Sequence, residues 1–109
     1  MIRRTGQLFD APGPLRVASY ECNGQLIYVG ISGLALVMAF PEKMRGQLNA
    51  AQADNDEAVE QIARASLSHL DITGQLDQAL APNSGDTRYL VVIGEEQWFR
   101  EAMRGLTSS

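Results

Sequence analysis

The sequence contains one cysteine, one histidine and no excess of basic residues. Cys22 has no second cysteine with which to close a disulfide, which fits a reducing compartment, and no neighbouring charge activates its thiol. His69 has no His-x-x-x-His partner, and no Cys-x-x-Cys pair is present, so we expect no metal site. Glycine-rich phosphate loops and calcium-binding loops are also missing from the sequence. We therefore expect no cofactor and no catalytic residue.

Basic residues are outnumbered by acidic ones. The chain has nine Lys and Arg against thirteen Asp and Glu, which gives a net charge of −4 at pH 7. Nucleic-acid binders neutralise phosphates with a basic stripe, whereas the only adjacent basic pair here is Arg3-Arg4. We expect no nucleic-acid partner.

No apolar stretch is long enough to span a membrane. The longest, from Leu26 to Phe40, has fifteen residues, and a membrane-spanning helix needs about 20. A signal peptide would place such a stretch near the start of the chain. The composition changes at Ser32-Gly33, from β-branched and aromatic residues to Leu, Ala and Met, which predicts a strand that leads into a helix. We expect no membrane segment and a cytoplasmic location.

The length of 109 residues fits a single small domain. Hydrophobic residues make up 45% and charged residues 20%, as in ordinary globular proteins. We expect one domain over residues 1–109, with residues 1–14 and 105–109 loosely ordered.

A hairpin is the clearest local pattern. The alternating pattern predicts a strand from Leu15 to Cys22 and a second strand from Gln25 to Ile31. Asn23-Gly24 between them predicts the tight turn of a hairpin. Ser32 is placed to cap a helix over residues 33–40, after which Pro41 either ends that helix or opens a second one over residues 41–49.

The rest of the chain predicts two longer helices and a strand. Asp54 and Glu57 resemble a capping box, and apolar residues then recur every three or four positions, which predicts a helix over residues 55–70 that stops before Gly74. Residues 88–93 (RYLVVI) predict a central strand. Residues 95–104 predict a final helix with Glu95 and Glu96 in its first turn. Residues 6–9 are a candidate for one more short strand.

Together these elements predict a two-layer α+β domain. Its small, mainly antiparallel sheet consists of the hairpin at residues 15–31 and the strand at residues 88–93. The helices at residues 33–40, 55–70 and 95–104 cover this sheet.

Two polar residues, Ser32 and His69, are functional candidates. Ser32 lies between a strand and a helix, as in a nucleophile elbow, but Leu34 stands where that motif has its last glycine. Helix capping is the alternative role for Ser32. His69 lies near the end of a predicted helix, where the helix dipole alone favours an imidazolium.

The final helix carries the candidate interaction residues. Trp98, Phe99 and Met103 fall on one face of it. Large aromatic residues belong to the core in most proteins, but they also anchor interfaces. The face is therefore either part of the core or an anchor for a partner or a second copy.

The sequence also resembles a known family. Ile31-Ser32-x-x-Ala35-Leu36 follows the hairpin, residues 59–63 read Val-Glu-Gln-Ile-Ala, and a closing strand at Tyr89 to Ile93 precedes Trp98-Phe99. Over about residues 15–99 this pattern is similar to the short bacterial family called domain of unknown function 1488. The resemblance implies a small α+β fold and brings no established activity and no functional residue.

Two classes of function remain open. The favoured one is a non-enzymatic interaction or regulatory module, whose partner is another protein or a second copy in a homodimer, bound through an edge strand or the final helix. The alternative is a small enzyme or ligand-binding domain with a pocket between sheet and helices, in which Ser32, His69 or Tyr89 would supply polar groups.

Overall fold

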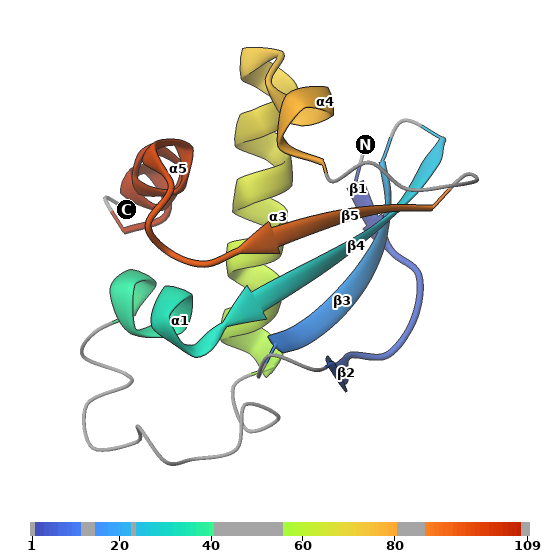
Figure 1. Cartoon of the computed structure of the whole chain (residues 1–109), viewed down its shortest axis with the longest axis horizontal. Helices are drawn as coiled ribbons and strands as arrows, with labels where there is room; N and C mark the ends of the chain where they lie inside the picture. Colours follow the sequence, from blue (N-terminus) through green and yellow to red (C-terminus); the bar gives the residue numbers. More distant parts are fainter. Residues whose placement is uncertain (1, 12–14, 23, 41–55, 81–86, 108–109) are drawn as a thin grey trace.

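The computed structural model describes residues 2–11, 15–22, 24–40, 56–80 and 87–107. These residues form an α+β domain with one sheet of five strands (Figure 1). The strands are β1 (Ile2–Arg4), β2 (Phe9–Ala11), β3 (Leu15–Cys22), β4 (Gln25–Ser32) and β5 (Thr87–Val92). The described helices are α1 (Gly33–Ala39), α3 (Asp56–Thr73), α4 (Leu76–Ala79) and α5 (Gln97–Thr107).

The predicted hairpin forms the centre of the sheet. β3 and β4 are antiparallel and pair along their whole length, from Leu15 opposite Ser32 to Cys22 opposite Gln25. Gly24 in the turn has a φ of 81°, a conformation that glycine adopts without strain. β1 and β2 both pair with β3, at opposite ends of its outer edge, and β5 lies parallel to β4.

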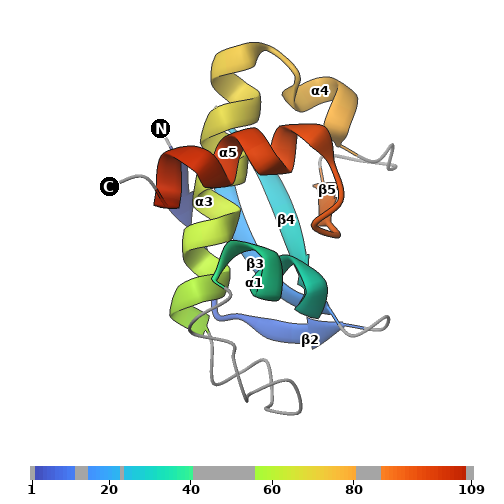
Figure 2. The same ribbon diagram turned by 90° about the vertical axis from the view of Figure 1, so that its left-hand side faces the viewer.

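Helices α1, α3 and α5 lie on one face of the sheet (Figure 2). The core fills the space between the two layers, because alternate residues of each strand point towards the helices. From the strands it includes Ala18, Tyr20, Cys22, Ile27, Val29, Ile31, Leu90 and Val92, and from the helices Val59, Ile62, Leu67, Leu70, Phe99 and Met103. The predicted two-layer α+β class is confirmed.

The strand at residues 88–93 was predicted to be central, and this was wrong. β5 lies at the edge of the sheet, next to β4 only. The reason is that Leu90 and Val92 face the core while Tyr89 and Val91 are apolar residues on the exposed side. The resulting unbroken apolar pattern is typical of a strand covered on both faces.

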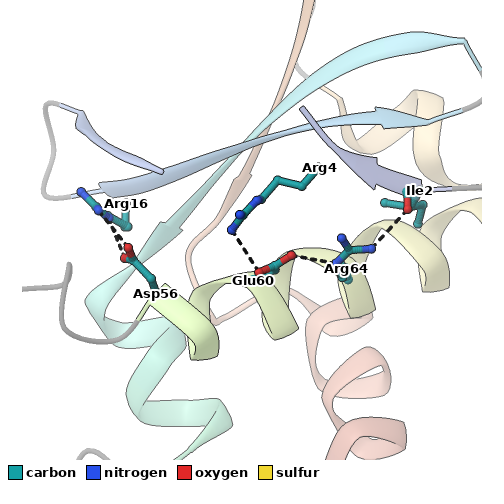
Figure 3. A network of polar contacts seen from close by, with 6 residues as sticks. All are labelled: Ile2, Arg4, Arg16, Asp56, Glu60 and Arg64. Carbon is teal, nitrogen blue, oxygen red and sulfur yellow. Dashed lines mark hydrogen bonds and ion pairs between the residues drawn. The ribbon is translucent and has the colours of Figure 1, made fainter. Parts of the chain in front are cut away.

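The N-terminal segment is more structured than expected. Residues 2–4 and 9–11 form strands paired with β3, whereas residues 1–14 were expected to be loosely ordered. The predicted strand at residues 6–9 is displaced, since the strand begins only at Phe9. Ion pairs hold β1 against α3: Arg4 Nη1 lies 3.2 Å from Glu60 Oε2, and Arg64 bonds both Glu60 and the carbonyl oxygen of Ile2 (Figure 3).

The helix boundaries differ at their ends. α3 extends three residues past the predicted end at Leu70 and stops before Gly74, whose φ is 75°. α5 begins at Gln97 rather than Glu95, because the Glu96 carboxylate accepts hydrogen bonds from the Ile93 and Gly94 amides before the helix begins. α5 then continues to Thr107, inside the tail that was expected to be loose. The predicted helix at residues 41–49 and the Asp54 cap lie outside the described residues.

No helix in the described part of the chain combines the length and apolar character needed to cross a membrane.

Candidate functional site

The face of the sheet opposite α1, α3 and α5 is covered by none of the described helices (Figures 1 and 2). Because side chains alternate along a strand, the residues that flank each core position point to this open side. Eight of them line a single hollow, and we call this set the tyrosine face: Phe9, Ala11, Leu15, Val17, Tyr28, Gly30, Tyr89 and Val91.

The strand register brings these residues into rows across the sheet. Phe9 lies opposite Val17, Val17 opposite Gly30, and Gly30 opposite Val91. Residues paired in this way lie side by side on one face of a sheet. A continuous row therefore runs from β2 through β3 and β4 to β5.

Three aromatic rings stand on the tyrosine face. Tyr28 and Tyr89 are register partners, and their rings stack with centroids 5.4 Å apart and an interplanar angle of 24°. Phe9 meets Tyr28 edge to face, with centroids 6.2 Å apart. Such arrangements satisfy the electrostatic preferences of aromatic rings and hold them in defined positions.

A hollow lies beside these rings, above Gly30. Its volume is about 350 Å³, and Gly30 leaves its floor without a side chain. A Cβ added to Gly30 would lie 3.3 Å from Leu15 Cδ1, so the wall of the hollow is already close on that side. Among the residues that the structure describes, none that lines the hollow is charged. The apolar lining suits an apolar or aromatic group.

The tyrosine face exposes large apolar side chains. Phe9 is 45% exposed, Tyr89 44% and Val91 43%. Scattered apolar residues are normal on a protein surface, but a contiguous set marks a site of interaction. Here the exposed residues share one row and one hollow, so they form a contiguous surface.

Charged neighbours do not change this surface. Asp10 lies between Phe9 and Ala11 in β2, but its carboxylate turns to the helical side and binds Arg16 at 3.1 Å. Arg3 and Glu21 pair at 3.2 Å at the opposite end of β3, where their charges cancel. The tyrosine face therefore carries no net charge.

Ser32 has a structural role in the folded chain. Its hydroxyl accepts a hydrogen bond from the Ala35 amide at 3.1 Å, which confirms the predicted helix cap. The same hydroxyl donates to the carbonyl oxygen of Ile93 at 2.7 Å and so ties the end of β4 to the end of β5. Both bonds stabilise the junction of sheet and helix.

His69 lies between two helices. Its Nε2 is 3.3 Å from Glu101 Oε2 on α5, close enough for an ion pair when the imidazole is protonated. Nε2 is buried, and none of the described residues forms a hydrogen bond with it. His69, Ser32 and Tyr89 thus contact different parts of the fold and do not form one site.

The residues predicted on the final helix lie mostly inside the molecule. Phe99 is 1% exposed and Met103 5%, and Trp98 packs partly buried against the same core. The Trp98 and Phe99 rings meet edge to face at 6.5 Å. This burial favours the core interpretation of the helix face over the anchor interpretation.

Cys22 is buried in the core, and burial raises the pKa of its thiol. A raised pKa lowers the fraction of reactive thiolate, in line with the inert role expected from the sequence.

Most of the tyrosine face was missed at the sequence level. The signal was the absence of polar residues at alternate positions of RYLVVI and LIYVGI. From these runs we expected a buried strand before Ser32 and a central strand at residues 88–93, because unbroken apolar runs are typical of strands covered on both faces. The open side follows from the positions of α1, α3 and α5, which all lie on the other face of the sheet (Figure 2).

Comparison of the chain with family models, curated proteins and solved structures finds no match. Membership in the family of unknown function 1488 stays a prediction.

Proposed function

We propose that this protein is a non-enzymatic interaction module that binds a protein surface through the tyrosine face. The observation that carries the proposal is the contiguous, uncharged and exposed set of aromatic and aliphatic side chains on the open side of the sheet. Monomeric proteins rarely keep such a set in contact with water unless it serves binding.

The chemistry of the surface suits a protein partner. Burial of apolar area contributes about 25 cal/mol per Å², so covering exposed side chains such as Phe9 and Val91 supplies binding energy. Tyrosine is enriched in interfaces because its ring is apolar while its hydroxyl tolerates water. Tyr28 and Tyr89 are also held by stacking, which lowers the entropy lost on binding.

The alternative, an enzyme or ligand-binding domain with a pocket between sheet and helices, has less support. Core side chains such as Ile27, Ile62 and Phe99 occupy the space between the two layers. The polar groups weighed for that role, Ser32, His69 and Tyr89, have separate partners. A nucleic-acid partner is likewise not proposed, because phosphate binding needs positive charge that the tyrosine face lacks.

The test compares two variants with the wild type. Tyr89→Ser with Val91→Thr makes the tyrosine face polar, and Ile72→Ser changes an 82% exposed residue of α3 outside it. We expect all three proteins to be folded under the assay conditions, with a lower melting temperature for the double variant because it loses the stacking of Tyr89 on Tyr28. The wild type and Ile72→Ser should associate with another protein or with themselves, and the double variant should not.

The readouts are co-purification from cell extract, with quantitative mass spectrometry, and sedimentation velocity of the purified chain. Association retained by the double variant contradicts the proposal. So does a wild-type chain that binds neither itself nor any other protein.

A further inference from the structure

We infer that the partner of the tyrosine face is a second copy of this chain, related by a two-fold axis that passes through the open side of the sheet. This inference rests on the proposed function, because it uses the same surface. It goes further by naming the occupant and the symmetry of the contact.

Charge is the first argument for a second copy. In a two-fold contact the same patch meets itself, so every unbalanced charge on the patch faces its own sign. Two chains of net charge −4 repel each other over most approaches. The tyrosine face is free of this penalty, because its eight residues are uncharged and Arg3 is paired with Glu21 beyond them on β1 and β3.

Shape is the second argument. The tyrosine face has both a projection and a recess: Phe9 and Tyr89 are exposed, and the Gly30 hollow of about 350 Å³ lies between them. In a two-fold dimer, a residue of one copy that enters the recess of the other is matched by the same residue in the reverse direction. The patch therefore has what a self-complementary surface requires. A ring from each copy would fill the hollow of the other, as interface anchors fill pockets.

Area is the third argument. The sheet is four strands wide, because β1 and β2 share the outer edge of β3. With strands about 4.8 Å apart and about 3.3 Å per residue, the eight-residue strands β3 and β4 and the shorter strands beside them give the whole open face an area of about 450 Å². The relief of the side chains makes the accessible area larger. Stable interfaces bury about 800 Å² per partner, so a contact through this face falls below that size and fits a weak, reversible dimer.

This area predicts a modest affinity. Interfaces of standard size range from micromolar to picomolar, and a smaller interface without charge pairs is expected at the weak end of that range. We therefore expect a dimer that forms at micromolar concentration and dissociates on dilution. Two sheets packed face to face in this way lie about 10 Å apart and form a sandwich with helices on both outer sides.

The experiment introduces a positive charge on the tyrosine face, so that two like charges, one from each copy, face each other in the dimer. Tyr89→Arg places a guanidinium on the tyrosine face of both copies, and Ile72→Arg makes the same change of charge on α3 as a matched control. Sedimentation velocity and native mass spectrometry over nanomolar to high micromolar concentrations report the dimer. Thermal melting checks that each variant is folded. We expect the wild type and Ile72→Arg to dimerise alike and Tyr89→Arg to weaken dimerisation at least tenfold.

The other outcomes separate the two proposals. A dimer that persists in Tyr89→Arg overturns the inference, because the copies then meet elsewhere. A monomeric wild type that captures another protein, with capture lost in Tyr89→Ser/Val91→Thr, overturns the second copy but supports the proposed function. A monomeric wild type without any partner overturns both.

Discussion

Arg16 of β3 binds both carboxylate oxygens of Asp56, the first residue of α3. Arg16 Nε lies 2.9 Å from Oδ1 and Nη2 3.1 Å from Oδ2 (Figure 3). The Arg16 side chain is only 11% exposed and also binds Asp10 of β2. The hydrogen bond with Asp56 raises the pKa of Arg16, so this cation is permanent at any physiological pH. One side chain thus joins β2, β3 and α3.

Replacing Arg16 with Lys is expected to lower stability. Lysine keeps the charge but cannot make two parallel bonds to one carboxylate. Because Asp56 is partly exposed, we expect a loss of about 1–2 kcal/mol, near the low end for charge-assisted bonds. Urea unfolding measures it. Arg3→Lys is the control: its pair with Glu21 is well exposed and should change stability by less than about 0.5 kcal/mol. Equal losses in both variants would argue against the joining role of Arg16.

Tyr20 makes the free energy of unfolding depend on pH in the alkaline range. Burial raises its pKa from 10.0 to about 12, so the folded chain holds the phenol proton more tightly than the unfolded chain does. This contribution to stability, on the order of 3 kcal/mol, is complete below pH 10 and is lost as the pH rises towards 12. Stability measured against pH in wild type and Tyr20→Phe should show the extra alkaline loss only in the wild type.

The same substitution has a second expected effect at neutral pH. The Tyr20 hydroxyl is buried and finds no hydrogen-bond partner among the described residues. Tyr20→Phe removes it and keeps the ring, over which Arg64 Cζ lies at 5.4 Å. We expect stability at pH 7 to stay equal or rise by up to about 1 kcal/mol. A clear loss at pH 7 would mean that the hydroxyl has a stabilising partner.

Ser32→Ala removes two hydrogen bonds at once. The cap to Ala35 and the bond to Ile93 both depend on the hydroxyl. We expect a loss of about 1–2 kcal/mol in chemical unfolding. Ser32→Thr keeps a hydroxyl and should recover most of the loss. If the alanine and threonine variants are equally unstable, the hydroxyl is not the cause.

Gly94 and Gly24 form a matched pair for the effect of a methyl group. Both have positive φ, 107° and 81°. A Cβ on Gly94 would lie 3.0 Å from Ala35 Cα, whereas one on Gly24 would meet nothing within 4 Å. Gly94→Ala therefore combines backbone strain with a clash against α1 and should cost more than about 2 kcal/mol. Gly24→Ala should cost only the strain, about 1 kcal/mol. Thermal unfolding of the two variants compares them directly, and equal losses would contradict the close approach at Gly94.

Features that depend on neighbouring residues in the chain were predicted correctly, and features that depend on distant residues were not. The hairpin turn at Gly24, the Ser32 cap and the stop at Gly74 depend on neighbours in the chain, and their features in the described residues agree with the prediction. The position of β5 depends on pairing with a strand far away in the chain, and no local pattern encodes it. The tyrosine face could not be predicted for the same reason, because its residues come from four different strands. Trp98 and Phe99 were candidate interaction residues because large aromatic side chains often anchor interfaces. In the folded chain Phe99 lies in the core and Trp98 packs against it.

The parallel pairing of β4 with β5 also has a consequence for the order of folding. The register partners Tyr28 and Tyr89 are separated in the chain by α1, α3 and α4, whereas β3 and β4 are joined by a tight turn. Hairpins close within about 1–10 μs, but pairing between distant segments must first overcome the entropy of a long loop. We expect β5 to dock last, after α3 has packed on the hairpin. Until β5 docks, the edge of β4 that it covers is unpaired and can pair wrongly with another chain. This risk of misassembly therefore lasts until β5 has paired with β4.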